Sequence, residues 1–418
     1  MQPAAARVGE TPSMSDTAHK ANMLARVILN PTQEKRLLAG HNWVFSNEIR
    51  EVFAESEPQA GDLALVVAAS GHELGLAFYH PHSLIAARML TRSPKEPIDA
   101  DFFGKRLADA IAYREKVCPG ENAYRLCFGE SDGLPGLIID RYGSILVLQV
   151  LSAGIERRLD LIAQALCALL KPQGIYLKND HRTRSLEGLP LECRTLSGVV
   201  PEKVPIVEGG LRFTAAIGEG QKTGHYFDQR DNRAYLRPFF ANRIVLDLYC
   251  YTGGFAITAA KAGAKSVLAI DSSGPALTLA KENVKLNGVE RTVSFDEGDA
   301  EKALDAFALL QQPFKPDFIV LDPPSLVPAK KHLPKALRLY AKLNSQALRA
   351  LPRGGYLATA ACSHHVSRED FVLMLRNAQA KAQRAVRFVS LRGQSSDHPI
   401  LLAMPETEYL HFALLEVL

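Results

Sequence analysis

The 418-residue sequence predicts an α/β protein of several domains, in which the C-terminal half forms a mostly parallel sheet with helices on both faces. Strand-like and helix-like patterns alternate from residue 218 to residue 418. Short β-rich runs separated by turns fill residues 23–95, and residues 96–217 mix both kinds of element. We therefore expect a disordered tail at 1–22, a small β-barrel at 23–95, a central α+β domain at 96–217 and an α/β domain at 218–418.

The composition is that of an ordinary globular protein, with 47% hydrophobic and 22% charged residues, and excludes a disordered chain. The six cysteines show no C-x-x-C spacing, which argues against a zinc ribbon and indicates reduced cytosolic thiols. Residues 1–20 lack the apolar segment of a signal peptide, and no apolar run approaches the ~20 residues that cross a bilayer. We expect a cytoplasmic protein with no membrane association and no metal.

The predicted elements follow the chain in order. In the barrel, strands are expected at 26–29, 63–69, 74–79 and 85–90, with a short helix at 33–38. In the central part, Asp99 or Asp101 can cap a helix that ends near residue 117. Hairpins at 137–150 and 204–215 and an amphipathic helix at 155–170 complete this part.

The C-terminal strands are expected at 244–250, 266–270, 293–295, 318–321, 356–361, 386–391 and 409–415. The last two lack a convincing helix between them. We therefore expect them to form an antiparallel pair at the sheet edge.

A glycine-rich motif follows the first of these strands. It consists of Tyr251, Thr252, Gly253, Gly254 and Phe255. The glycines let the backbone approach a ligand, and the next helix offers free N–H groups. Asp271 and Asp299 end the next two strands, where they could bond a ribose hydroxyl pair and an adenine amino group. Because the dinucleotide fingerprint G-x-G-x-x-G is absent, the pattern favours S-adenosylmethionine (SAM) over NAD. The alternative without a ligand is that the glycines form a tight turn and that Asp271 and Asp299 are helix caps.

Two further motifs end the fourth and fifth strands. Asp322 is followed by two prolines that stiffen its loop, and is expected to lie over the crevice beside the methyl donor and to contribute to SAM binding. Ser325 comes next, where enzymes that methylate exocyclic amines carry an aromatic residue. Cys362 is placed to be a nucleophile beside the methyl donor, because a thiolate that adds to C6 of a pyrimidine makes C5 reactive. Cys250, also near the donor loop, is interpreted as a packing residue, and the His364-His365 doublet as a phosphate or proton contact without metal spacing.

A segment at 219–230 precedes the α/β domain and mixes glycines, aromatic residues and charges. It is either a polar linker or a lid that folds back over the donor. As a lid, Tyr226 or Phe227 would stack on the ligand, and Lys222 or Asp228 would bond to it.

The net charge of +4 is small but unevenly placed. Residues 1–95 are neutral and residues 96–217 carry −1, so the surplus lies in the C-terminal part. Residues 323–368 contain no acidic residue. We expect an RNA phosphate track there, because a solvated helix face normally mixes both signs. Its members are Lys330, Lys331, Lys335, Arg338 and Lys342, with Arg349 on the same helical face.

With these motifs, the chain resembles the bacterial large-subunit (23S) ribosomal RNA cytosine-5 methyltransferases that carry an N-terminal PUA domain. The resemblance runs from about residue 24 to the end. It rests on the stretches 40–46, 129–136, 222–230, 251–255, 322–324, 362–363 and 397–399. It implies a PUA-like RNA-binding barrel, a central α+β domain, a Rossmann-like SAM methyltransferase sheet and large-subunit rRNA as substrate.

The expected reaction is formation of 5-methylcytosine through a covalent bond between Cys362 and C6 of a flipped-out cytosine, with Asp322 holding the base. Ser325 and His364-His365 depart from the family pattern beside the base pocket. His411 falls near the position where related uridine enzymes carry a proton-accepting glutamate. Methylation of another base or of an exocyclic nitrogen, and a non-catalytic RNA-binding assembly factor, are the alternatives; monomer and homodimer both stay open.

Overall fold

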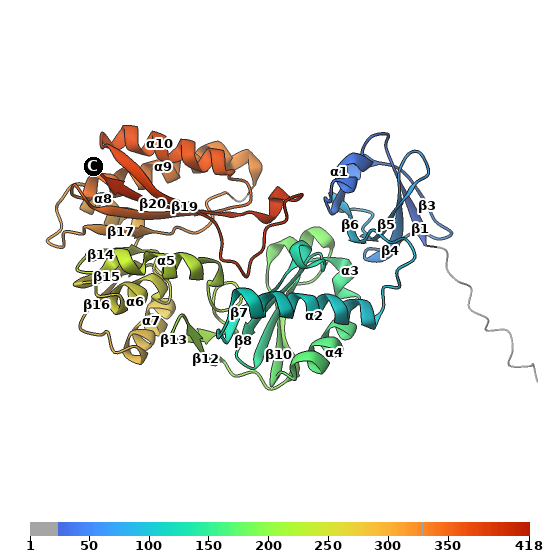
Figure 1. The fold of residues 1–418 in the computed structure, drawn as a ribbon, viewed down its shortest axis with the longest axis horizontal. Coiled ribbons are helices and arrows are strands. Elements are labelled where there is room, and N and C mark those ends of the chain that lie inside the picture. Colours follow the sequence, from blue (N-terminus) through green and yellow to red (C-terminus); the bar gives the residue numbers. More distant parts are fainter. Residues whose placement is uncertain (1–23, 328) are drawn as a thin grey trace, which may run out of the picture.

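The computed structural model describes residues 24–327 and 329–418, and Figure 1 shows three bodies that follow one another along the chain. Residues 1–22, the expected tail, lie outside the described residues. The N-terminal body is a six-stranded sheet in the order β2-β6-β5-β4-β1-β3. Its elements are β1 (Ala25–Leu29), α1 (Glu34–Leu38), β2 (Trp43–Phe45), β3 (Ile49–Phe53), β4 (Asp62–Val67), β5 (Glu73–Tyr79) and β6 (Ile85–Thr91). The four predicted strands are present, whereas β2 and β3 were missed because neither run shows a clear alternation of apolar and polar residues.

The central body is a five-stranded sheet in the order β11-β10-β9-β8-β7, which packs against helices α2 and α4. Its elements are α2 (Ala100–Val117), β7 (Ala123–Phe128), β8 (Leu137–Tyr142), β9 (Ile145–Val150), α3 (Ala153–Glu156), α4 (Leu159–Leu170), β10 (Gly174–Asn179) and β11 (Glu192–Gly198). Asp99 caps α2 as expected, by accepting a hydrogen bond from the Phe102 amide.

The predicted single helix at 155–170 is wrong at its start, because the helix is interrupted between α3 and α4. Arg157 and Arg158 occupy this break. Arg157 donates to the Asp62 carboxylate and Arg158 to the Gly61 carbonyl, both at the start of β4. The interruption thus turns two cations toward the N-terminal body.

The hairpin β12 (Lys203–Glu208) and β13 (Leu211–Ala216) lies between the central and C-terminal bodies. The Val207 amide donates to the Asn122 side chain of the central body, at 2.9 Å. The Thr214 amide donates to the Asn283 side chain of the C-terminal body, at 2.8 Å.

The C-terminal body is a seven-stranded sheet in the order β16-β15-β14-β17-β18-β20-β19, parallel except at β20. Its strands are β14 (Ile244–Leu248), β15 (Ser266–Asp271), β16 (Val293–Glu297), β17 (Phe318–Leu321), β18 (Tyr356–Cys362), β19 (Val386–Arg392) and β20 (Leu410–Val417). The predicted antiparallel pair β19–β20 is confirmed, and β20 inserts next to β18.

Helices cover both faces of this sheet (Figure 1). They are α5 (Arg230–Phe240), α6 (Gly254–Lys261), α7 (Gly274–Leu286), α8 (Ala300–Ala308), α9 (Leu333–Ala350) and α10 (Arg368–Ala382). Val245 packs with α5, α6 and α7, whereas its neighbour Leu246 packs with α8, α9 and α10. This alternation buries both faces and leaves the carboxyl ends of the strands as the open edge. No helix in the described ranges is both long and apolar enough to cross a membrane.

Candidate active site

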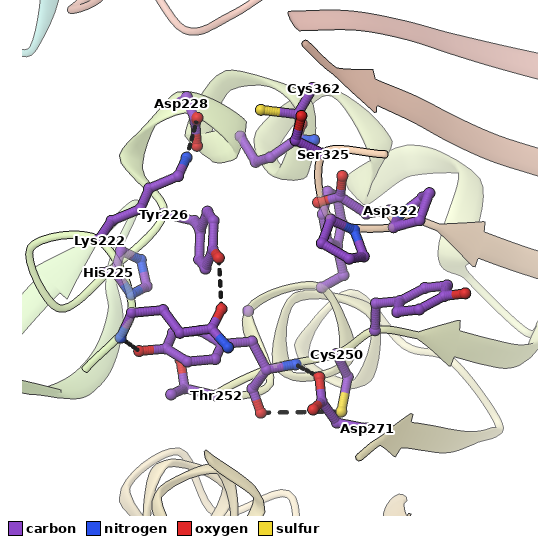
Figure 2. A pocket seen from close by; sticks show the side chains of 18 of the residues that line it. Lys222, His225, Tyr226, Asp228, Cys250, Thr252, Asp271, Asp322, Ser325 and Cys362 are labelled. Carbon is purple, nitrogen blue, oxygen red and sulfur yellow. Dashed lines mark hydrogen bonds and ion pairs between the residues drawn. The ribbon is translucent and has the colours of Figure 1, made fainter. Parts of the chain in front are cut away.

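A cavity of about 220 Å³ opens at the carboxyl ends of the parallel strands. Figure 2 shows Cys362 and Asp322 on one side of it, Thr252 and Asp271 on another, and Lys222 with Tyr226 on a third. Three of the predicted motifs and the segment at 219–230, all far apart in sequence, therefore meet at one place.

The loop after β14 forms the first wall. Tyr249, Tyr251 and Gly253 adopt left-handed conformations, with φ of 63°, 48° and 84°. For tyrosine this backbone costs on the order of 1 kcal/mol or more, and such strain concentrates at functional sites. Asp271 holds the loop, because one carboxylate oxygen accepts the Tyr251 amide and the other the Ser273 amide, both at 2.9 Å.

This wall fits the nucleoside end of SAM. The left-handed turn at Gly253 starts α6 at the cavity, and Gly254, Phe255 and Thr252 line it. Asp271 remains partly exposed to the cavity at the end of β15, where an acid can meet a ribose. Asp299 does not line the cavity. It is an exposed cap of α8 that accepts hydrogen bonds from the Glu301 and Lys302 amides.

The segment before α5 folds over the cavity as a lid rather than crossing the surface as a linker. Thr223 is fully buried and hydrogen bonds to Asp140 and to the Tyr142 hydroxyl, both on β8 of the central sheet. The Tyr142 hydroxyl also accepts the His225 amide, at 3.0 Å. With its middle anchored in this way, the segment presents Lys222 and Tyr226 to the cavity.

Lys222 and Asp228 of the lid form an ion pair of 2.5 Å. The Asp228 carboxylate also accepts the Tyr409 hydroxyl, at 2.9 Å, and the Lys222 ammonium lies 4.2 Å from the centre of the Tyr226 ring. Although burial opposes ionisation, the Lys222 charge holds the pKa of Asp228 well below its usual range, and Asp228 in turn raises the pKa of Lys222. Both groups are therefore charged at neutral pH.

Cys362 and Asp322 end the neighbouring parallel strands β18 and β17. Burial raises the pKa of the Cys362 thiol to about 12, against the opposing influence of Lys222. Burial and the nearby Asp228 charge raise the pKa of Asp322 to about 6. A thiol of high pKa thus faces the same cavity as a carboxyl group that can take or release a proton near neutrality.

The sequence reasoning missed a buried group that braces the lid. Arg233 donates two hydrogen bonds of 2.7 Å to Glu208 and one of 2.8 Å to the Tyr226 carbonyl. His225 also contacts Glu208, at 3.2 Å. Glu208 keeps its charge because Arg233 and His225 hold its pKa far below the usual range in spite of burial. Glu208 lies at the end of a hairpin strand, and nothing near it in the sequence indicates this pairing. Tyr409 was also missed, because its neighbours in the sequence do not indicate its contact with Asp228.

Several predicted residues lie away from the chemistry. His411 is buried on β20, where its Nε2 lies 2.8 Å from the Val366 carbonyl oxygen, and it does not line the cavity. His364 is exposed and contacts the Glu406 carbonyl oxygen at 3.1 Å. Cys250 is buried at the β14 loop but does line the cavity. Its position beside the donor wall in Figure 2, across from Cys362, agrees with a packing role.

The predicted basic stripe is exposed but not uniform. Lys330, Lys331, Lys335 and Arg338 lie exposed at and before the start of α9, and no ion pair joins them to another described residue. Lys342 pairs with Glu301 of α8, at 2.6 Å, and Arg349 donates to the Lys381 carbonyl. Glu301 of α8 thus compensates the charge of one member of the stripe, and the contact of Lys342 with RNA stays a prediction.

Across residues 24–327 and 329–418, no group of three or more His, Cys, Asp or Glu side chains is arranged to hold a metal ion.

The fold and the cavity define a class of enzyme, and comparison with known proteins agrees. Residues 147–399 match the family model of S-adenosylmethionine-dependent methyltransferases, and residues 27–92 match a PUA-like domain. The chain belongs to this SAM-dependent methyltransferase family, and SAM is its methyl donor.

Two relatives are each called ribosomal RNA large subunit methyltransferase I. The protein from Shewanella frigidimarina is 40% identical over 93% of this chain and 98% of its own length. The protein from Shigella boydii serotype 18 is 38% identical, with the same coverage. Among solved structures, one described as a SAM-dependent methyltransferase from Streptococcus mutans aligns with a TM-score of 0.81 at 20% identity, covering 94% of this chain and all of that one. A methyltransferase complexed with SAH aligns at 0.82, with the same identity and coverage. These two structures support the fold.

Proposed function

We propose that this protein methylates C5 of a cytosine in large-subunit ribosomal RNA through a covalent adduct with Cys362. The observation that carries the proposal is the placement of Cys362 and Asp322 on neighbouring strand ends of one cavity, facing the SAM wall. The names of the relatives support ribosomal RNA of the large subunit as the substrate. The absence of an aromatic residue at Ser325 favours a ring carbon over an exocyclic nitrogen.

The donor residues divide between the walls of the cavity. Asp271 and the loop Tyr251, Thr252, Gly253, Gly254 and Phe255 would hold SAM, and Tyr226 would close over it from the lid. We propose no donor contact for Asp299, because its side chain caps α8 outside the cavity.

In the proposed reaction, the Cys362 thiol loses its proton to the Asp322 carboxylate, and the thiolate forms a bond to C6. Asp322, now protonated, donates to N3 and accepts from the N4 amino group, so that charge developing on the ring is neutralised. SAM supplies the methyl group, which bonds to C5 as its bond to the donor sulfur breaks. A base or a water molecule takes the C5 proton, the electrons of the C5–H bond restore the C5–C6 double bond, and the Cys362 thiolate leaves from C6.

A protonated carboxyl group presents one donor and one acceptor, which match N3 and the N4 amino group of cytosine. Because its proton can reside on either oxygen, the same group also matches the reversed pattern of uracil, so the preference for cytosine does not rest on Asp322. The pKa of Asp322, about 6, keeps the protonated form accessible at neutral pH.

We further propose that the PUA-like domain at 23–95 and the exposed cations Lys330, Lys331, Lys335 and Arg338 hold the RNA, with Lys342 contributing less because of its ion pair. Residues 96–217 and 218–418 would be the central and methyltransferase domains. Acting on ribosomal RNA, the enzyme would work in the cytoplasm.

The test is methylation of large-subunit rRNA in vitro, with the product identified by mass spectrometry of nucleosides. Cys362→Ala is expected to abolish 5-methylcytosine, whereas Cys250→Ala, a cysteine that lines the same cavity, keeps it. Unimpaired 5-methylcytosine formation by Cys362→Ala would overturn the covalent route. A methylated exocyclic nitrogen formed without Cys362 would favour the alternative chemistry, and no methyl transfer by the unaltered protein would favour an assembly factor.

A further inference from the structure

The lid brings a charged pair to the cysteine side of the cavity, away from the SAM wall. Lys222 and Asp228 face Cys362 in Figure 2, and all three line the cavity. Lys222 has a left-handed backbone, with φ of 49°, which is strained for a lysine. The strain and the position of this cation on the side of a strand-end cysteine point to a role in the chemistry of Cys362.

We infer that the Lys222 ammonium is the group that stabilises the Cys362 thiolate, and that Asp228 and Tyr409 act as positioning residues for this ammonium. The inference rests on the proposed nucleophilic role of Cys362. Asp228 holds the ammonium at 2.5 Å, and Tyr409 holds Asp228 at 2.9 Å. Tyr409 is itself fixed beside the nucleophile, because its carbonyl accepts the Ser363 amide at 2.8 Å.

The charges around the thiol make a cation necessary. Asp322 from the β17 loop, Asp228 from the lid, and the hydroxyls of Tyr409 and of Tyr340 on α9 interact electrostatically with the sulfur. Both carboxylates raise the pKa of the thiol, and Lys222 is the cation that lowers it. Without Lys222 the thiolate would form in a buried site of negative charge.

The pair allows two substitutions with opposite expected effects. Lys222→Met leaves Asp228 as an uncompensated anion, which disfavours the thiolate. Asp228→Asn keeps a side-chain oxygen that can hold the Lys222 ammonium in place but removes the compensating negative charge, which favours the thiolate. A pair with a purely structural role would respond to both substitutions in the same direction, through loss of stability.

The experiment measures alkylation of Cys362 by iodoacetamide between pH 7 and 10 in the full chain without RNA, with the modified site read by mass spectrometry. Exposed Cys167 and Cys193 are replaced by serine in every variant. A charge within ~4–6 Å changes a pKa by about 1–3 units, so at a fixed pH Lys222→Met should slow alkylation about tenfold or more, and Asp228→Asn should accelerate it by a similar factor.

Two controls accompany these variants. Lys222→Arg keeps the charge and should retain most of the rate, and Lys203→Met removes an exposed cation paired with Glu282 and should change nothing. Equal rates in Lys222→Met and the parent, or changes of the same sign in Lys222→Met and Asp228→Asn, would overturn the inference. The proposed function is tested separately: if Cys362→Ala still forms 5-methylcytosine, the nucleophile is wrong, whatever alkylation shows.

Discussion

Replacing Asp322 with asparagine should change the pH dependence of methylation in a way that reveals proton transfer from Cys362. With pKa values of about 6 and about 12, the reactive state, with Asp322 protonated and Cys362 ionised, is rare. Its population relative to the resting state is on the order of 10⁻⁶, a cost of about 8 kcal/mol. This population is the same at every pH between the two pKa values, because raising the pH increases the ionised fraction of Cys362 by the same factor by which it lowers the protonated fraction of Asp322.

The unaltered enzyme should therefore show a flat profile of kcat/KM for RNA between pH 6.5 and 8.5, with a fall below pH 6. In Asp322→Asn, the amide offers a donor to N3 and an acceptor to the N4 amino group at every pH, so only the thiolate fraction changes. Its kcat/KM should rise about tenfold per pH unit, or about a hundredfold over this range. The assay is transfer of radiolabelled methyl from saturating SAM to rRNA.

Asp299→Asn is the matched control, because it makes the same chemical change at an exposed helix cap where asparagine serves equally well. It should keep the flat profile and an unchanged KM for SAM. A flat profile in Asp322→Asn would refute the proton transfer from Cys362 to Asp322. A tenfold rise per pH unit in the unaltered enzyme would refute the coupling of the two groups.

Three further results are expected. Asp397→Asn should lower stability by about 3–5 kcal/mol at pH 7 in urea unfolding, because it leaves buried Arg230 without its 3.1 Å partner. Since the folded pKa of Asp397 is depressed, this difference should begin to shrink as the pH falls below about 4, the ordinary value for an aspartate, and should be lost as the pH falls through the lower folded pKa; a constant difference would contradict it. The double substitution Lys335→Gln and Arg338→Gln should reduce the slope of the log RNA-binding constant against log salt by about 1.4, because each contact with single-stranded RNA contributes ~0.7. Lys342→Gln should change this slope less, and a comparable change would argue against the ion pair with Glu301. Trp43→Phe removes a 2.8 Å hydrogen bond worth about 1.5–3 kcal/mol that joins the N-terminal body to Glu130 of the central body. It should weaken RNA binding and leave the rate of single-turnover methylation at saturating RNA unchanged. A lower rate would indicate that the barrel takes part in the methyl-transfer step.

Prediction from sequence succeeded where the signal was local. Strands β14, β15, β17 and β18 are mostly apolar runs, and parallel strands bring their carboxyl ends to one edge, so Asp271, Asp322 and Cys362 could be placed together. Asp299 satisfied the same rule, yet its side chain caps α8 and does not line the cavity, because a residue two positions past a strand can turn back to the next helix. The rule predicts the edge but not the direction of each side chain.

Contacts between distant segments had no such signal. Tyr409 precedes β20, which folds back between β18 and the edge strand β19, and only this antiparallel register brings it to Asp228. Lys342 lies on a helical face that reads as basic along α9, yet its partner Glu301 belongs to another helix. Such pairs depend on how elements pack, which periodicity alone does not determine.

The central sheet holds two segments beside Cys362, the lid and the loop that leads to Tyr409, in fixed positions relative to each other. Arg125 on β7 is bonded to Asp140, and Asp140 accepts from Thr223 in the middle of the lid. The Arg125 amide also donates to Asp397, in the loop between β19 and β20 that leads to Tyr409. One buried arginine thus connects the segment that carries Lys222 and Asp228 with the segment that carries Tyr409.

This connection gives the central body a role that its charge also supports. Residues 96–217 hold 15 basic and 16 acidic residues, a balance that suits internal ion pairs better than a phosphate track. Arg114, for example, is fully buried and bonds both Asp132 and the Asp397 carbonyl. We therefore expect substitutions at Arg125 to reduce methylation, because the lid and the Tyr409 loop would lose their common anchor. In such variants, replacing Lys222 should no longer change the rate of Cys362 alkylation. The salt dependence of RNA binding should stay unchanged.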